Sequence, residues 1–239
     1  DLHVTVGIGG TEPRDADKKL EFALDAIYKI DPQLDAFCLV GDVTDNGTID
    51  QYKHLMQLVD DNVKEPTQAI ICQGNHETYS WGVQQAREVF EEQTGQAANQ
   101  VVDVNGVRVI TMGPWGSSDG DYRGNYDWFV QQLEEQGCND KVPFLVLTHH
   151  QMQGTSYTSP EWHGNFGQGG NQDFAKLMGR YPNLVQVSGH SHATLEDERS
   201  ISQDLGFTAI QDSTIGAYYE NETGKVDPTS GDGASVPPQ

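Results

Sequence analysis

Four short apolar runs in this sequence each end in a cluster of glycines and metal-binding side chains, and this repetition limits the possible folds more than any other feature. The runs begin at Ala36, Ala69, Phe144 and Leu184, and the motifs GDVTD, GNHE, THH and GHSH follow them. Ligands of open α/β sheets bind at the carboxyl ends of the strands, so we expect these four ends to meet in one crevice. The pattern predicts a layered α/β domain with one shared site.

Segments with the apolar periodicity of an α-helix lie between these runs. Apolar residues recur at helical spacing from Leu20 to Ile30, from Tyr52 to Val59 and from Val83 to Phe90. Tyr126 to Gln136 and Asp173 to Arg180 are also expected to be helices. This alternation of strands and helices indicates βαβ units.

Two further features concern the middle and the end of the chain. Asn105-Gly106 lies between two alternating runs, which is typical of a tight hairpin. The segments GFTAIQDST and IGAYY are expected to add antiparallel strands. We expect one domain over residues 1–219, and the Gly-, Pro- and Ser-rich residues 220–239 to form a tail or the start of a linker.

The chain is strongly acidic, with 36 Asp and Glu against 14 Lys and Arg and a formal net charge of -22. This balance opposes binding to nucleic acid, and no apolar stretch is long enough for membrane insertion. It favours an extracellular or cell-surface location over a cytoplasmic one. Of the three cysteines, Cys38 and Cys72 lie in apolar runs and are expected to be core thiols rather than disulfide partners.

Five of the eight histidines lie at the four strand ends. A single histidine in such a place is more often a hydrogen-bonded structural residue, but four coincidences in the same topological position favour a metal site. Carboxylate, amide and imidazole ligands together suit Mn, Fe or Zn better than Ca, which prefers oxygen ligands alone. We therefore expect one or two divalent metal ions per chain.

The four motifs, in this order and after successive strands, resemble the calcineurin-like metallophosphoesterase family. The resemblance extends from Val4 to about Tyr219 and includes NYDWFVQQLEE, which is similar to the helix that follows the central hairpin in that family. It implies an α/β fold, a four-layer α/β/β/α sandwich of two mixed sheets flanked by helices, with a dinuclear metal site.

The resemblance also implies residue roles. Asp42 matches the carboxylate that bridges both ions, Asn75, His149 and His190 match the other ligands of the second ion, and His192 matches a ligand of the first. His76 resembles the histidine that contacts the phosphate and protonates the leaving oxygen, and Asp45 resembles the residue that orients it. His150 is expected to be a second-shell or loop residue, His3 and His54 surface or packing residues, and His163 a weak candidate for substrate contact.

One part of the family pattern is expected to be missing. The family has an Asp-x-His motif at the end of its first strand, and the run HVTVGIGG places Gly7 and Gly9 there. The first ion would then keep only Asp42 and His192, which is too few protein ligands for a tight site. Three explanations are open: Asp15 or Asp17 replaces the lost ligands, the site uses one ion, or the protein is a degenerate member that binds without hydrolysing. A fourth explanation is an error or a missing segment in the sequence.

The function expected from this pattern is that of a metal-dependent phosphoric ester hydrolase. It would hydrolyse a small phosphate mono- or diester by metal-activated hydroxide. The alternative is a degenerate, non-catalytic family member that acts as a binding module. A serine hydrolase is a weaker alternative, because the GSSDG motif at residues 116–120 does not join a strand directly to a helix. The sequence leaves the substrate and the oligomeric state open.

Overall fold

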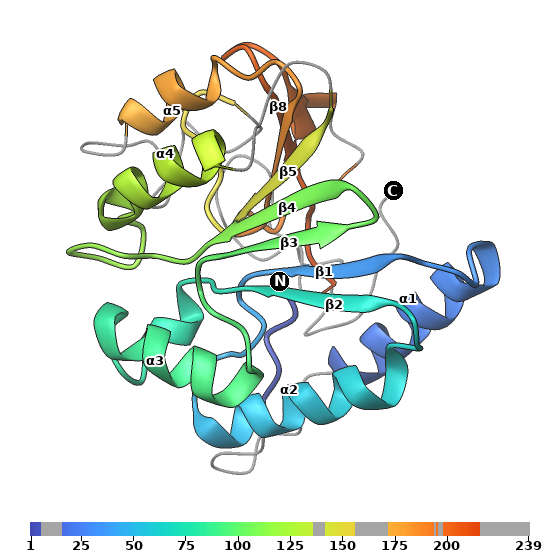
Figure 1. Cartoon of the computed structure of the whole chain (residues 1–239). Helices are drawn as coiled ribbons and strands as arrows, with labels where there is room; N and C mark the ends of the chain where they lie inside the picture. The colour runs from blue at the N-terminus through green and yellow to red at the C-terminus, as the bar shows by residue number, and fades with distance from the viewer. Residues whose placement is uncertain (6–15, 136–141, 156–171, 194, 196–197, 216–239) are drawn as a thin grey trace.

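The computed structural model describes residues 1–5, 16–135, 142–155, 172–193, 195 and 198–215, and these residues form two sheets with helices on their outer faces (Figure 1). In the smaller sheet β1 (Ala36–Val40) pairs in parallel with β2 (Gln68–Cys72), and Val40 lies opposite Cys72. Both strands therefore end at the same edge.

The larger sheet has six strands in the order β3-β4-β5-β6-β8-β7. They are β3 (Gln100–Val104), β4 (Val107–Met112), β5 (Phe144–Thr148), β6 (Leu184–Ser188), β7 (Ile201–Ser202) and β8 (Thr208–Gln211). β4, β5, β6 and β8 are parallel, whereas β3 and β7 run antiparallel to their neighbours. The sheet is therefore mixed, and β5 and β6 end side by side.

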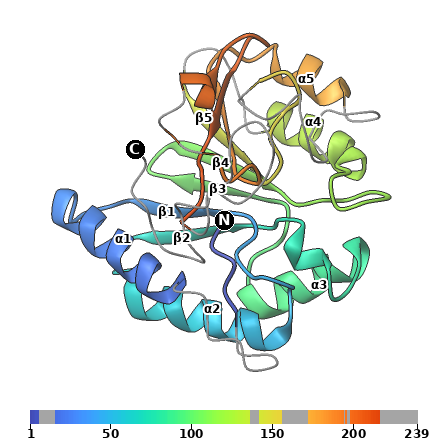
Figure 2. The same ribbon diagram turned by 180° about the vertical axis from the view of Figure 1, so that it is seen from behind.

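Five α-helices form the outer layers. α1 (Ala16–Ile30), α2 (Ile49–Asn62) and α3 (Val83–Thr94) lie on the side of β1 and β2, and Figure 2 shows the same arrangement from behind. α4 (Tyr126–Glu135) and α5 (Gln172–Met178) cover the larger sheet. None of the helices in the described ranges is long and apolar enough to cross a membrane.

Three apolar clusters hold these layers together. One joins α1, α2 and α3 to the smaller sheet, and a second joins α4 and α5 to the larger sheet. The third lies between the sheets and contains Val40, Ile70, Cys72, Val109 and Leu147. Burying apolar side chains between all layers removes them from water and stabilises the stack. The predicted four-layer α/β/β/α sandwich is confirmed.

Local sequence signals explain several element boundaries. Thr48 caps α2 in a reciprocal capping box with Gln51, and α3 ends at Gly95 with a φ of 70°. Asn105 and Gly106 have φ values of 51° and 89°, as the predicted tight hairpin requires. Cys38 and Cys72 are free thiols that pack between the sheets, which confirms the prediction for both.

The predicted terminal strands are only partly correct. β8 was expected to be antiparallel, but it pairs in parallel with β6 and antiparallel only with the short β7. At the other end of the chain, Val4 forms an isolated parallel bridge with Thr44. The structure does not describe residues 6–15 or 216–239. The second range contains the last four residues of the segment IGAYY and the predicted tail 220–239.

Candidate metal centre

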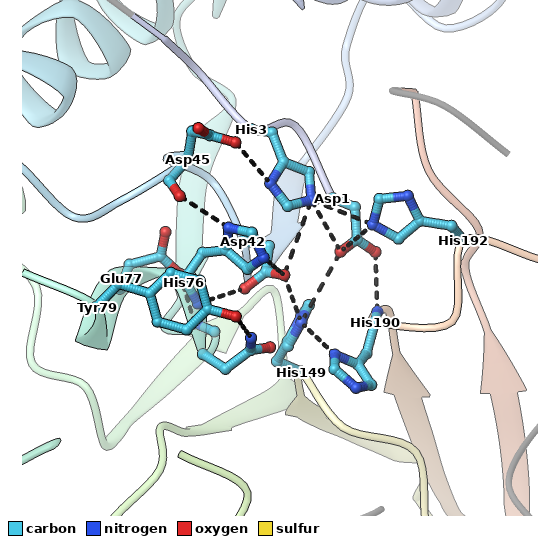
Figure 3. A network of polar contacts seen from close by, with 12 residues as sticks. Asp1, His3, Asp42, Asp45, His76, Glu77, Tyr79, His149, His190 and His192 are labelled. Atoms are coloured by element: carbon cyan, nitrogen blue, oxygen red, sulfur yellow. Dashed lines mark hydrogen bonds and ion pairs between the residues drawn. The ribbon is translucent and has the colours of Figure 1, made fainter. Parts of the chain in front are cut away.

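Polar side chains from five segments converge where the strands end (Figure 3). β1 leads to Asp42, β2 to Asn75 and His76, β5 to His149, and β6 to His190 and His192. The first three residues of the chain complete the group, because Leu2 and His3 donate backbone hydrogen bonds to the carbonyl of Asp42. All five predicted metal ligands lie at this edge, although their role as ligands stays a prediction.

The first part of the cluster, called here the strand-end half-site, consists of Asp42, Asn75, His149 and His190. His149 Nε2 lies 3.0 Å from Asp42 Oδ2 and 3.2 Å from His190 Nδ1. Asn75 is adjacent because the next backbone amide, that of His76, donates to Asp42 Oδ1 at 2.9 Å. Ligand atoms of Asp42, His149 and His190 lie within 4.8 Å of one another, which is close enough to contact one cation.

The second part, the amino-terminal half-site, consists of Asp1, His3 and His192, and it corrects the sequence analysis. The Asp-x-His motif is present as Asp1-Leu2-His3. His3 was expected to be a surface or packing residue, but it is 4% exposed, and its Nε2 lies 3.1 Å from His192 Nε2. Asp1 Oδ1 lies 3.3 Å from His192 Nε2. The three residues offer ligand atoms within 4.8 Å of one another.

The motif was missed because the strand was expected to begin at His3 and to end near Gly7 and Gly9. The spacing of Asp1 and His3 was the available signal. The proposed replacement by Asp17 is wrong, because its Oδ2 contacts His54 Nε2 at 2.8 Å outside the cluster. Asp15 lies outside the described residues.

The backbone at the cluster adopts conformations that most residues avoid. Asp42, His190 and His192 have φ values of 46°, 67° and 50°. Non-glycine residues in this left-handed region are typically found at functional sites, where the surrounding structure compensates for the strain. Figure 3 shows Asp42 in the middle of the cluster, with the His190 ring beside His149 and the His192 ring directed at His3 and Asp1. The strained backbone thus orients the side chains toward a common centre.

Two glycines allow close approaches within the cluster. A Cβ atom on Gly41, which has a φ of 79°, would lie 2.4 Å from His149 Nδ1. A Cβ atom on Gly74 would lie 2.2 Å from the backbone nitrogen of Asp42. Both positions require glycine, because any side chain would push β1 and β2 away from the candidate ligands.

His76 and Asp45 lie together, but not through the contact that was expected. His76 Nδ1 is 2.8 Å from the backbone carbonyl oxygen of Asp45. The Asp45 carboxylate instead lies 3.7 Å from His3 Nδ1. Since the carbonyl accepts a hydrogen bond from Nδ1, the other ring nitrogen, His76 Nε2, faces the cluster, 3.8 Å from Asp42 Oδ2. Asp45 therefore orients His76 with its main chain.

Burial and charge act differently on the two half-sites. Burial lowers the pKa of His3 well below its usual value, despite the opposing effect of Asp42, so the imidazole stays neutral. Burial alone would raise the pKa of Asp42, but the charge and hydrogen bond of His149 hold it well below its usual value. Burial opposes charge on His149 too, yet Asp42 raises the net pKa of His149. A cation bound by His149 would therefore compete with the proton that Asp42 favours on this ring.

The residues fit a pair of divalent cations. His149 Nδ1 donates a hydrogen bond of 2.9 Å to the carbonyl oxygen of Val40, so Nε2 is the ring nitrogen directed at the cluster. Asp1 Oδ1 and Asn75 Oδ1 are buried without hydrogen-bond partners among the described residues. Buried oxygens are rarely left in this state, and imidazole, carboxylate and amide groups are ligands for Mn, Fe or Zn.

Glu77 supports the site and was not predicted from the sequence. It is fully buried, and its Oε1 accepts hydrogen bonds from the backbone nitrogen and hydroxyl of Thr44, while Oε2 accepts one from the nitrogen of Gly74. Burial, together with the charge of Asp42, raises the pKa of Glu77. Glu77 therefore ties the segment after β1 to the segment after β2, and its position in GNHE was the available signal.

Two other candidates, His150 and the motif GSSDG, do not join the cluster. His150 is buried, and its Nδ1 lies 3.0 Å from the hydroxyl of Tyr122, which agrees with the expected supporting position. The motif GSSDG lies in a loop where Asp121 accepts hydrogen bonds from Ser117, so Ser118 is not on a strand-to-helix turn. His163 lies outside the described residues.

Comparisons with known proteins agree with this arrangement. A family model described as calcineurin-like phosphoesterase matches residues 1–194. A search of curated proteins gave no match.

Two solved structures share the fold. A dimetal phosphatase from Danio rerio superposes with a TM-score of 0.56 at 11% identity, over 88% of this chain and 84% of that chain. A purple acid phosphatase from yellow lupin (Lupinus luteus) seeds superposes with a TM-score of 0.55 at 14% identity, over 88% of this chain and 42% of that one. This chain therefore spans less than half of the lupin protein.

Proposed function

Because the chain belongs to the calcineurin-like phosphoesterase family, we propose that it hydrolyses a small phosphate mono- or diester with two divalent cations. The observation that carries this proposal is the presence of two adjoining half-sites, with Asp42 between them. Asp42 Oδ2 lies 3.0 Å from His149 Nε2 and 3.8 Å from His3 Nε2. This carboxylate is therefore placed to contact a cation on either side.

Each half-site has its own ligand set in this proposal. Asp1, His3 and His192 hold one cation, Asn75, His149 and His190 hold the other, and Asp42 contacts both. When bound, such ions neutralise charge on phosphoryl oxygens and lower the pKa of water. Among the proposed ligands only Asp1 and Asp42 are carboxylates, so the ligand set itself brings two negative charges against the four positive charges of two cations. The occupied pocket would still attract a phosphate, despite the acidic surface.

His76 is proposed to help the leaving group depart. When water attacks phosphorus and the bond from phosphorus to the leaving oxygen breaks, that oxygen gains charge and needs a proton. His76 Nε2 faces the cluster and would donate this proton, while the Asp45 carbonyl keeps Nδ1 in place. The side chain of His76 is 25% exposed, so solvent can return the proton afterwards.

The alternative of a non-catalytic binding module rested on the missing Asp-x-His motif. Asp1 and His3 remove that reason, because they supply the ligands that the first ion was thought to lack.

Metal content and turnover test the proposed function together. The protein would be treated with a chelator, reloaded with Mn²⁺ and assayed with p-nitrophenyl phosphate and bis-p-nitrophenyl phosphate. We expect two Mn²⁺ per chain, and turnover that disappears with the chelator and returns with the metal. Bound Mn²⁺ without turnover of either ester would favour the binding module instead.

A further inference from the structure

Tyr79 lies at the border between the metal cluster and solvent. It directly follows the short helix η1 (His76–Thr78), four residues after Asn75. The Tyr79 side chain is 52% exposed, whereas Asn75 is 5% exposed. Figure 3 shows the Tyr79 ring beside His76, with its hydroxyl directed toward the cluster. Tyr79 therefore has one end at the candidate ligands and a ring surface in contact with solvent.

The hydroxyl of Tyr79 determines how Asn75 is held. Asn75 Nδ2 donates a hydrogen bond of 2.8 Å to the Tyr79 oxygen. The backbone of Asn75 is fixed separately, because its carbonyl accepts hydrogen bonds from the nitrogen and hydroxyl of Thr78 at 2.9 and 2.7 Å. With its NH₂ group bound on one side, the amide presents Oδ1 on the other, where it is buried without a hydrogen-bond partner among the described residues.

The ring of Tyr79 is the outermost of three neighbouring rings. The centroids of His76 and Tyr79 are 4.4 Å apart with an interplanar angle of 38°. On its other side, His76 meets His3 edge-on, also at 4.4 Å. A group that takes a proton from His76 would therefore leave beside the Tyr79 ring. Aromatic faces at this range of distances attract planar groups.

We propose that Tyr79 has two roles, as the positioning residue for Asn75 and as the contact surface for a planar aromatic leaving group of a phosphoester. The inference rests on the proposed phosphoesterase function and adds a class of preferred substrate to it. The hydrogen bond to Asn75 links the roles, since it holds the ring at the site and orients the amide oxygen at the same time.

The test of the positioning role is the affinity of the chelator-treated protein for Mn²⁺, measured by calorimetry. Tyr79→Phe keeps the ring but removes the hydroxyl, and we expect it to weaken Mn²⁺ binding at the strand-end half-site about tenfold. The matched control is Tyr28→Phe, which removes a hydrogen bond of 2.9 Å to Thr67 at the opposite end of β2. This control should bind Mn²⁺ like the wild type. Unchanged Mn²⁺ affinity in Tyr79→Phe would overturn the positioning role, whereas a wild type that binds no Mn²⁺ would contradict the proposed function.

The contact role is tested by the affinities of phenylphosphonate and methylphosphonate for the Mn²⁺-loaded protein. The wild type should prefer phenylphosphonate, and Tyr79→Leu should reduce this preference about threefold to tenfold. Tyr79→Phe should retain it because the ring remains. Phe22→Leu removes an aromatic ring that is 76% exposed on α1, and it should have no effect. An equal preference in Tyr79→Leu and the wild type would refute the contact. Binding needs no turnover, so the result is independent of catalysis.

Discussion

The two half-sites share Asp42 but differ in how their candidate ligands are positioned. The strand-end half-site takes its ligands from segments that directly follow β1, β2, β5 and β6. The amino-terminal half-site depends on Asp1 and His3, which are held by backbone hydrogen bonds from Leu2, His3 and Val4 to Asp42 and Val43. Parallel pairing aligns the ends of β1 with β2 and of β5 with β6, and packing of the two sheets brings these ends together. Asp1 and His3 instead reach the site through hydrogen bonds of their own segment to the residues after β1.

The half-sites also differ in protonation. His3 is buried and kept neutral, so its nitrogen is ready to bind a cation. His149 is paired with Asp42 at 3.0 Å, and its raised pKa favours the protonated form. In the metal-free protein a cation would thus compete with a proton at His149, whereas burial already favours the neutral imidazole of His3.

The largest expected effect is that of Asp42→Asn, because the Asp42 carboxylate lies between His149 of one half-site and His3 of the other. The amide has no negative charge, so we expect both Mn²⁺ ions to bind weakly and kcat/KM for aryl phosphates to fall by at least about 100-fold. Activity assays with metal analysis would measure both losses. The matched control is Asp17→Asn, which removes a carboxylate paired with His54 and should retain activity. Full activity in Asp42→Asn would rule out the bridging position.

A substitution in one half-site should remove the cation bound there and leave the other half-site occupied. His3→Ala removes a ligand of the amino-terminal half-site, and we expect the metal content to fall from two Mn²⁺ per chain to one, with a loss of activity of about 10- to 100-fold. His54→Ala is the control, since His54 contacts Asp17 away from the cluster. Retention of both ions by His3→Ala would mean that the half-sites are not divided as proposed.

Glu77, which ties together the segments after β1 and β2, should contribute to the stability of the fold. Glu77→Gln replaces an acceptor of three hydrogen bonds by an amide whose NH₂ group faces donors, so we expect a loss of about 2 kcal/mol in the free energy of unfolding. Urea denaturation of the metal-free protein would measure it. Glu92→Gln, an exposed change on α3, should leave the stability unchanged. Equal stabilities of the two variants would contradict the structural role of Glu77.

The smallest effect is a difference in pKa between the two histidines. In the metal-free protein, NMR titration should show His149 losing its proton above the usual pKa of 6.5 and His3 below it. His149 therefore contributes stability that is fully present below pH 6.5 and is lost as the pH rises through its folded pKa. His3 has the opposite sign, because the fold loses stability as the pH falls below 6.5. Equal pKa values would remove the proposed difference in protonation.

Much of this protein could be predicted from local sequence. Apolar periodicity predicted the helices and most strands because burial on one face requires it, and Asn105-Gly106 predicted the hairpin. The strand-end motifs predicted that Asp42, Asn75, His149, His190 and His192 would meet, because parallel strands end at one edge. The signal was less useful for β8, since strand direction depends on its partner rather than on its own residues.

The sequence by itself determined the layers and the chemical types of side chain at the strand ends, because both follow from periodicity and from the direction of parallel strands. Only the tertiary structure placed Asp1 and His3 in the cluster and directed the Asp45 carbonyl, rather than its carboxylate, at His76. The physical reason is that these contacts join segments far apart in the chain. Their geometry depends on backbone hydrogen bonds and left-handed conformations that form only when the two sheets pack together.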